Sequence, residues 1–404
     1  MKFNLEFTYT IDTEDCKLNT LIRGFNEMKQ VFLNEYIQKV LIGFAEYHMS
    51  QEKKPFCCSK CLNENHFIWK TKHGKTTKII TILQVVLLNQ LQVQCSCCGH
   101  KFFITRSLLG LEKRARILPE TIKKLGLIGA LTTFRVSEKI ASLFGIALDK
   151  MTIWRAVQKT AKDIEFGIDP EEEAAGEADG TGIPIVGIKQ RGQEMKVFVQ
   201  RKKSGGVRIA GLSIGKYDQG WDALFKPLIP SLKKFKKFLL ITDGDNSILK
   251  SIKDIVQIKT QRCLWHIPHQ FKYVLWKDKV TRKSDDWLYA LGEILSICSI
   301  KSIQDESRKD VIEKMITSKE KQLNALIGYC EDEGWKNCAV YLQNARGDMF
   351  TCIRNRLNGK TTSHAERVMK TINYRINVGK WTPAGALNVN KIRLAYYYNG
   401  FDVS

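Results

Sequence analysis

The chain is most constrained by residues 238–247, which read Phe-Leu-Leu-Ile-Thr-Asp-Gly-Asp-Asn-Ser. An apolar run that ends in a polar turn indicates a buried strand, and a helix is expected to begin at Ser247 or just before it. In open α/β sheets, ligand and catalytic sites gather at the carboxyl ends of the strands. We therefore expect an α/β fold in which Asp243 lies at a functional edge of the sheet.

The residues before this strand predict further elements of the same sheet. Segments 177–185, 194–201 and 207–217 are rich in strand formers, and residues 219–232, apart from their prolines, are expected to form a helix. This order is that of the first half of an RNase H-like fold, which has three strands, a helix, a strand and a helix. In that order the first and fourth strands are neighbours, so Asp179 and Asp243 are expected to lie close together.

The charge of the chain favours a polyanionic partner. Lys and Arg total 64 against 42 Asp and Glu, a formal charge of +22, and nucleic acid is the usual partner of such a chain. We see no secretion-signal pattern and no apolar stretch of about 18–20 residues, so no membrane partner is expected. Twelve cysteines in such a chain indicate thiols or metal sites in a reducing compartment.

Two Cys-x-x-Cys pairs predict a zinc site within residues 55–106. Cys58 and Cys61 form the first pair, and Cys95 and Cys98 form the second. Two such turns can place four thiolates around one Zn²⁺, as in a zinc ribbon. Neighbouring residues leave the ligand set open, and unligated buried cysteines are the alternative. The other candidate ligands are Cys57, Cys97, His66, His73 and His100.

Residues 115–168 have the pattern of a helix-turn-helix. Pro119 is expected to begin a helix, and Ala141, Gly145, Ile153 and Val157 have the spacing of the helical packing in this motif. An ordinary helical hairpin with solvated lysines explains the same pattern. On the DNA-binding interpretation, the outward-facing side chains are Lys150, Thr152, Arg155, Gln158 and Lys159.

The remaining segments complete the expected domain organisation. Residues 1–54 are expected to form an N-terminal region with a helix over 21–47. The acidic stretch 169–173 is expected to be a domain boundary and a solvated linker. Residues 174–270 and 356–404 are expected to form the core, interrupted by a helical insertion over 271–355. A late basic helix is expected over 361–375, with the acid Glu366 near its start. It also carries three candidate phosphate contacts, Arg367, Lys370 and Arg375. Their binding to DNA would depend strongly on the salt concentration.

Three acids have the chemistry for phosphodiester cleavage. That reaction uses two divalent ions about 3.5–4 Å apart, and Mg²⁺ or Mn²⁺ prefers carboxylate oxygens. Asp179, Asp243 and Glu366 form such a set, with Asp245 as the rival of Asp243. Each has a simpler interpretation: a turn at Asp179, a helix cap at Asp243, and a capping box from Ser363 to Glu366.

The motifs around these acids resemble the Mutator-like transposases and the related bacterial insertion-sequence transposases. The resemblance covers residues 176–380 and rests on Asp179-Gly180, Asp243-Gly244, Arg262-Cys263-x-x-His266 and Ser363-His364-Ala365-Glu366-Arg367. It implies an Asp-Asp-Glu triad on an RNase H-like core with a helical insertion. It also implies binding of terminal inverted repeats, metal-dependent cleavage and transfer of the 3′ ends to target DNA. The expected protein is a homo-oligomer on DNA, cytoplasmic with the nucleoid, or nuclear in a eukaryotic host.

Two other functions remain open at this point. A non-catalytic DNA-binding regulator derived from a transposase would be free to lose its carboxylates, and an RNase H-like nuclease would not transfer strands. Cys263 and His266 could also be metal ligands with His269, or a nucleophile–base pair, although no oxyanion turn accompanies them. Trp265 is expected to pack rather than to stack on an unpaired base.

Overall fold

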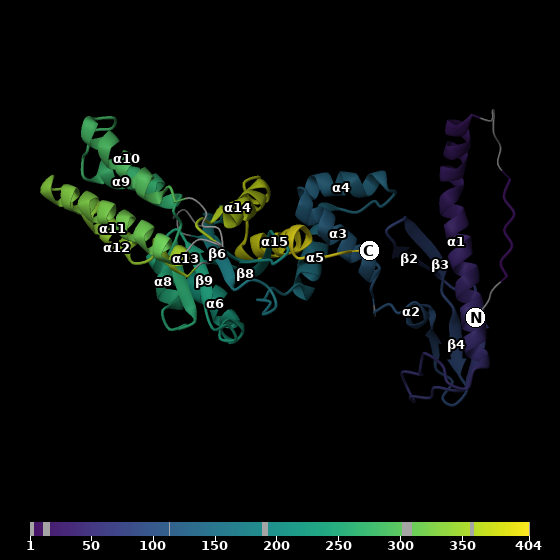
Figure 1. The fold of residues 1–404 in the computed structure, drawn as a ribbon. Helices are drawn as coiled ribbons and strands as arrows, with labels where there is room; N and C mark the ends of the chain where they lie inside the picture. Colours follow the sequence, from purple (N-terminus) through teal and green to yellow (C-terminus); the bar gives the residue numbers. More distant parts are fainter. Residues whose placement is uncertain are drawn as a thin grey trace. The chain divides into compact units, whose positions relative to one another are not determined.

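The computed structural model describes residues 4–10, 17–112, 114–187, 193–300, 309–355 and 359–403. The chain divides into two compact units, Met1–Thr160 with the last two residues and Ala161–Asp402. The expected α/β class is confirmed, since helices and a mixed sheet both occur (Figure 1). Each unit is built around its own sheets and core.

The first unit combines a long helix with short antiparallel strands. Strands β1, β4 and β5 form one sheet, and the hairpin of β2 and β3 packs against α1. Leu41 and Ala45 of α1 share a core with Val86 and Leu88 of β3, whose alternation buries one face of the hairpin. The elements are α1 (Leu18–Ser50), β1 (Phe67–Thr71), β2 (Thr76–Ile80), β3 (Val85–Asn89), β4 (Gln92–Cys95), β5 (Lys101–Phe103) and α2 (Thr105–Leu108).

Three helices complete the first unit: α3 (Pro119–Leu131), α4 (Phe134–Leu143) and α5 (Lys150–Thr160). A glycine lets α3 and α5 approach closely, because a Cβ on Gly126 would lie 2.4 Å from Oγ1 of Thr160. The α5 helix begins where Asp149 accepts hydrogen bonds from the backbone N–H groups of Met151 and Thr152. As expected, Ile153 is fully buried.

The second unit is built on a five-stranded sheet of order β10-β9-β6-β7-β8. Strand β9 is parallel to β10 and β6, whereas β6, β7 and β8 are antiparallel. All five residues of β9 are buried, which explains its continuous apolar run. The strands are β6 (Ala175–Gly182), β7 (Glu194–Arg201), β8 (Val207–Gly215), β9 (Phe238–Thr242) and β10 (Ile258–Arg262).

Helices cover both faces of this sheet. One face packs against α6 (Tyr217–Phe225) and α8 (Asn246–Ile252), and α14 (Ser363–Ile376) and α15 (Pro383–Tyr398) pack against β6 and β8. We expected a helix over 219–232 apart from its prolines, and α6 ends at Phe225, two residues before the first of them. It is followed by the 3₁₀ turn Lys226–Leu228 and by α7 (Ile229–Leu232). The reason is Pro227 and Pro230, which lack the N–H that a continuous helix needs.

The helical insertion shares its core with the sheet. Leu239 and Ile241 of β9 belong to the same buried cluster as Leu275 of α9 and Leu342 of α12. Within the predicted insertion, residues 301–308 lie outside the described residues, as do residues 356–358 at the predicted return to the core. The helices are α9 (His266–Lys277), α10 (Asp285–Cys298), α11 (Lys309–Asp332), α12 (Lys336–Arg346) and α13 (Thr351–Arg354).

The acidic stretch 169–173 is bonded to the second unit, although we expected a solvated linker there. Asp169 Oδ2 lies 2.6 Å from Nη1 of Arg208, and Gln200 Nε2 donates to the carbonyl oxygens of Asp169 and Glu173. These contacts hold the stretch against β7 and β8. The boundary between the two units therefore falls earlier, after Thr160.

Candidate active site

The pairing of β6 with β9 brings the first two acids together. The strands run parallel with Glu177 opposite Ile241, and continuing this register by two residues sets Asp179 beside Asp243. Asp243 directly follows the last residue of β9, so its carboxylate stands at the carboxyl end of that strand. Adjacent parallel strands therefore carry one acid each at the same edge.

Asp179 experiences the charges of the other two acids. Burial raises the pKa of its carboxyl to about 6, and the charges of Asp243 and Glu366 act in the same direction. The backbone N–H of Gly180 and the His266 ring oppose this shift. Three carboxylates thus lie within electrostatic range of one another, at a point where negative charge is poorly solvated.

The turn after Asp243 has a geometry that only glycine fits well. Gly244 has a φ of +90°, and a Cβ on it would lie 2.5 Å from Cζ of Arg262. That guanidinium is buried, and its Nε donates to Oδ1 of Asp348 at 3.0 Å. The Asp243-Gly244 and Arg262-Cys263 motifs therefore pack against each other, and this contact holds the backbone that follows Asp243.

Asp245 has a structural explanation. It is the N-cap of α8, and its side chain accepts hydrogen bonds from the backbone N–H and the hydroxyl of Ser247, at 2.9 and 2.6 Å. The backbone N–H of Asp245 in turn donates to Oδ1 of Asp243 at 2.9 Å. The capping role that we considered for Asp243 thus belongs to Asp245.

Glu366 lies in the first turn of α14. The N-cap of this helix is Thr362, which makes no side-chain capping bond, so the capping box between Ser363 and Glu366 is not formed. Glu366 Oε1 lies 3.9 Å from Nε2 of His266. The carboxylate is therefore directed toward the Cys-x-x-His segment rather than back to its own helix start.

Cys263 and His266 join three elements of the site. The N–H of Cys263 donates to the carbonyl of Thr242, and its Sγ accepts from the backbone N–H of Thr362 at 3.4 Å. Nδ1 of His266 lies 3.3 Å from Oγ1 of Thr362. Burial favours the neutral imidazole, but Cys263, Asp179 and Asp243 outweigh it and raise the pKa of His266. This pair links the ends of β9 and β10 to the start of α14.

A buried acid for which the sequence predicts no role also anchors α14. Glu177 on β6 is fully buried and lies 2.7 Å from Nη2 of Arg201. Its other oxygen accepts from the backbone N–H groups of His364 and Ala365, both at 2.9 Å. The sequence signal for this role was a glutamate within the buried run that precedes Asp179. Glu177 connects the strand that carries Asp179 to the helix that carries Glu366.

Replacing Glu177 with glutamine is expected to lower the free energy of unfolding by about 3 kcal/mol or more, because Arg201 loses its carboxylate partner in a buried setting. The measurement is urea unfolding of the full chain. Asp169→Asn is the matched control, since it removes a carboxylate from a more exposed arginine pair and should cost about 1 kcal/mol or less. Equal losses in the two variants would contradict the anchoring role of Glu177.

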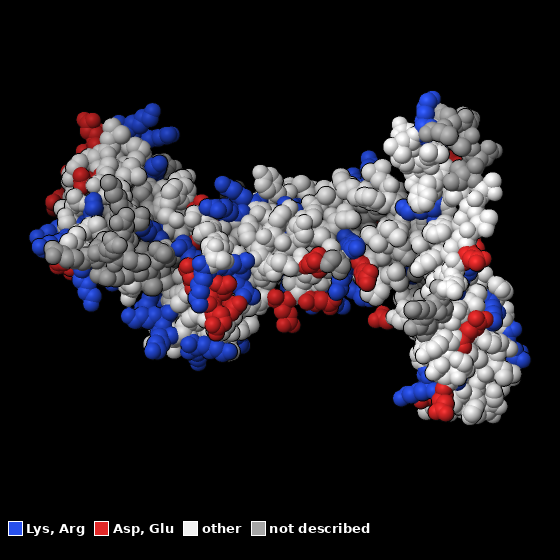
Figure 2. Space-filling model, turned by 45° about the vertical axis from the view of Figure 1, so that its right-hand side comes forward, with Lys and Arg blue, Asp and Glu red and all other residues white. Residues whose placement is uncertain are grey.

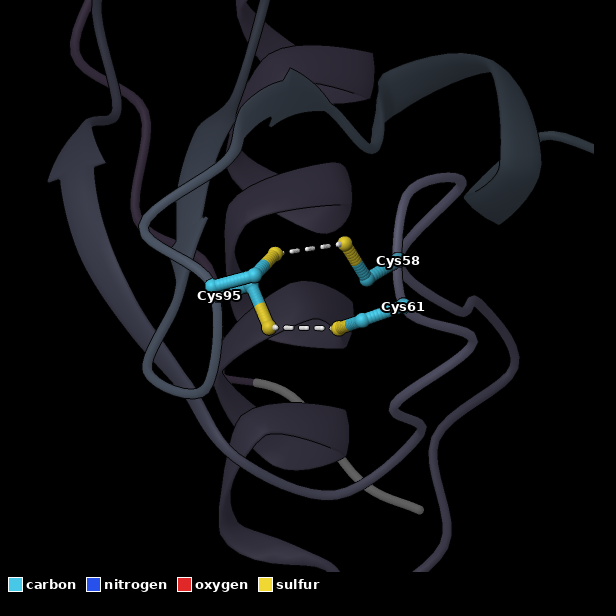
Figure 3. Close-up of side chains that lie close together, drawn as sticks. Cys58, Cys61 and Cys95 are labelled. Atoms are coloured by element: carbon cyan, nitrogen blue, oxygen red, sulfur yellow. Dashed lines mark hydrogen bonds between the residues drawn. The ribbon is translucent and has the colours of Figure 1, made fainter.

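The two predicted Cys-x-x-Cys pairs meet in the first unit. The sulfur atoms of Cys58, Cys61, Cys95 and Cys98 all lie within 4.8 Å of one another. Those of Cys61 and Cys95 are 3.5 Å apart (Figure 3). Of the described residues, only these four make up this group. It excludes Cys57 and Cys97, which are exposed, and the candidate ligands His66, His73 and His100. The cluster can therefore bind a metal such as zinc.

Hydrogen bonds favour a thiolate at Cys95, whereas at Cys61 the backbone N–H of Asn63 is outweighed by the neighbouring cysteine sulfur atoms and by burial, which raise the pKa to about 12. Burial opposes ionisation of Cys95, yet its pKa is lowered to about 6 by the side chain of Asn63 and the backbone N–H groups of Cys97 and Cys98. Nδ2 of Asn63 lies 3.4 Å from Sγ of Cys95. Thiolates are the form in which cysteines bind metals, so the turns support the ligand role.

Only some of the side chains predicted to contact DNA are exposed. Lys150, Arg155 and Lys159 are exposed on α5, whereas Thr152 and Gln158 are half-buried. On α14, Arg367 and Lys370 are also exposed.

Arg375, the third predicted phosphate contact of α14, differs from this pattern. Its side chain is 4% exposed, and its Cζ lies 4.7 Å from the centre of the Trp381 ring. The reason is its position in the last turn of α14, on the face that packs into the unit. Arg375 is therefore a core contact and is not available to a phosphate.

Comparisons with known proteins do not indicate a function for this chain. The sequence matches no protein-family model and no curated protein. Among the described residues, no helix has the length and apolar character needed to cross a membrane. Function is therefore inferred from the carboxylate site and the cysteine cluster.

Proposed function

We propose that this chain is a DNA transposase of the Asp-Asp-Glu class, related to the Mutator-like and bacterial insertion-sequence enzymes. The observation that carries the proposal is the pairing of β6 with β9, whose register sets Asp179 beside Asp243. The 3.9 Å contact of His266 with Glu366 supports the inclusion of the third acid. These are the residues that phosphodiester chemistry with divalent ions requires.

We also propose an RNase H-like identity for the catalytic unit and a zinc-ribbon identity for residues 55–106. The strand order β10-β9-β6-β7-β8, with an antiparallel β6-β7-β8 meander, supports the first. The four clustered thiols beside the β1-β4-β5 sheet support the second. The insertion between β10 and α14 has the place that the transposase resemblance implies.

The three carboxylates fit hard divalent ions, because Asp179 is half-buried and its charged form is already destabilised. Asp179, Asp243 and Glu366 would hold Mg²⁺ or Mn²⁺, which when bound activates the attacking oxygen and stabilises the leaving oxygen. The chain positions these acids by three means. Arg262 supports the turn after Asp243, Glu177 holds the start of α14, and the His266 ring attracts the Glu366 carboxylate at 3.9 Å.

DNA would be bound through exposed basic side chains in both units. On α5 these include Arg155 and Lys159, and on α14 they include Arg367 and Lys370. Figure 2 shows Lys and Arg side chains spread over the visible face, with smaller groups of acids among them. Such contacts with transposon ends and target DNA would weaken steeply as salt rises. A homo-oligomer on DNA is part of this proposal.

The test is a reaction of the purified chain with the DNA that flanks its gene, in the presence of Mg²⁺. We expect nicking at the element ends and joining of 3′ ends to a target plasmid, both lost in Asp243→Asn while DNA binding persists. Equal activity in that variant would contradict the role of Asp243. Binding without cleavage would instead favour a regulator, and cleavage without joining would favour a nuclease.

A further inference from the structure

Helix α9 and the residue before it carry an unusual row of exposed aromatic side chains. Trp265 is 53% exposed, Tyr273 is 62% exposed and Trp276 is 75% exposed. Trp265 lies flat against His269, with ring centres 5.1 Å apart and an interplanar angle of 13°. The rings of His269 and Tyr273 are nearly perpendicular, with an interplanar angle of 75° and ring centres 6.0 Å apart. We expected Trp265 to pack, but it is only partly covered.

The row occupies one face of the helix. Residues spaced by three, four, seven, eight or eleven positions share a face, which places Trp265, His269, Tyr273 and Trp276 in a single stripe. Lys272 belongs to the same face and is exposed. The opposite face holds Phe271 and Leu275, which are fully buried in the core shared with β9. The core therefore does not account for the aromatic stripe.

The stripe borders a hollow with basic walls. The hollow has a volume of about 530 Å³ and lies between α9, the end of α10 and residues 360–361. Trp265, His269, Lys272 and Lys360 line it, over an apolar floor that includes Ile300. No carboxylate is among the described residues that line it. An aromatic wall beside two ammonium groups is suited to a base and its phosphates.

The hollow lies next to the proposed catalytic carboxylates. Trp265 directly precedes His266, whose Nε2 is 3.9 Å from Glu366 Oε1. Lys360 lies two residues before the N-cap Thr362 of the helix that carries Glu366. A strand that left the carboxylates along this path would meet Trp265 first and Trp276 last.

We infer that the α9 stripe, comprising Trp265, His269, Lys272, Tyr273 and Trp276, binds unpaired bases of a DNA strand next to the catalytic site. Inside a duplex the faces of each base are covered by its neighbours, so away from a duplex end only an unpaired base can stack on Trp265. Lys272, which is exposed, would hold an adjoining phosphate, and Lys360, whose Nζ also donates to the carbonyl oxygen of Ile300 at 2.7 Å, would add positive charge beside it. This inference rests on the proposed function for its placement, but it concerns binding and can be tested without cleavage.

The test compares two DNAs of the same sequence by fluorescence anisotropy, one fully paired and one with a short single-stranded 3′ tail. All proteins are full-length and carry Asp243→Asn, so that no DNA is cut. Without a further change, the protein is expected to bind the tailed DNA more tightly. Trp265→Ala should weaken binding of the tailed DNA about tenfold, with little effect on the paired DNA. Trp265→Phe should keep most of the preference.

The control is Tyr289→Ala, which removes an aromatic side chain that is 50% exposed on the neighbouring α10. It should leave the preference for tailed DNA unchanged. Equal weakening of both DNAs by Trp265→Ala would overturn the inference, as would no weakening at all. A change in oligomeric state without a change in the preference would show that the stripe is a protein contact. If cleavage of flanking DNA fails while the Trp265-dependent preference persists, only the proposed function is contradicted.

Discussion

An amide in place of any one of the three carboxylates is expected to slow DNA cleavage about 10³-fold or more. Bound divalent ions contribute several kcal/mol to such reactions, and each 1.36 kcal/mol is a factor of ten, so a loss of about 4 kcal/mol gives this factor. The variants are Asp179→Asn, Asp243→Asn and Glu366→Gln. The measurement is the single-turnover rate of nicking at saturating DNA.

The three acids are expected to act as one unit. If each variant loses metal-dependent cleavage, then combining Asp179→Asn with Glu366→Gln should slow the reaction little further. Asp245→Asn is the matched control, because asparagine caps a helix as well as aspartate and Asp245 serves α8. A rate loss in the control as large as that in Asp243→Asn would contradict the assignment of the second acid.

Replacing Cys95 with serine is expected to remove zinc from the chain and to unfold the region around the cluster. Structural zinc binds with about 10 kcal/mol or more of free energy, which is coupled to folding. Losing half of this would lower the melting temperature of a unit of this size by about 10–20 °C. The measurements are zinc content per chain by mass spectrometry and thermal unfolding by calorimetry.

Cys97→Ser is the matched control for the zinc prediction. Cys97 lies two residues away, is exposed and lies outside the four-sulfur group. The control is expected to keep one zinc per chain and an unchanged melting temperature. Full zinc content in Cys95→Ser, or loss of zinc in the control, would contradict the ligand set.

The sequence predicted the parts of the site that depend on local pattern. The buried run of β9 identified the strand and the acid at its end, because few other local structures fit five consecutive apolar or β-branched residues. Cys-x-x-Cys spacing likewise identified all four sulfur atoms that cluster. In both cases the information lies within a few neighbouring residues, which a single chain displays directly.

The contacts that the sequence did not predict join distant residues. Glu177 meets the start of α14 across 187 residues, and Arg262 meets Asp348 across 86. No local period encodes such pairs. The burial of Arg375 was missed for the same reason, since a basic residue on an amphipathic helix ordinarily faces solvent. Its place near Trp381 depends on how α14 packs in the unit.

The role of Asp245 shows how two adjacent acids can be distinguished. Both Asp243 and Asp245 precede a helix, and either could have capped it on sequence grounds. Asp243 follows β9 directly, whereas Asp245 comes after the left-handed turn at Gly244 and reaches Ser247. The glycine turn, required by the close approach of Arg262, thus separates a strand-end acid from a helix cap.

The most direct test of the proposed catalytic site is to locate manganese. Crystals of the full chain with bound DNA, grown in Mn²⁺, would be measured at the manganese absorption edge. We expect anomalous peaks contacting carboxylate oxygens of Asp179, Asp243 and Glu366, with metal–oxygen distances of about 2.0–2.3 Å. These peaks should vanish in Asp179→Asn. An absence of manganese at these oxygens, or an unchanged peak in the variant, would contradict metal-dependent chemistry at this site.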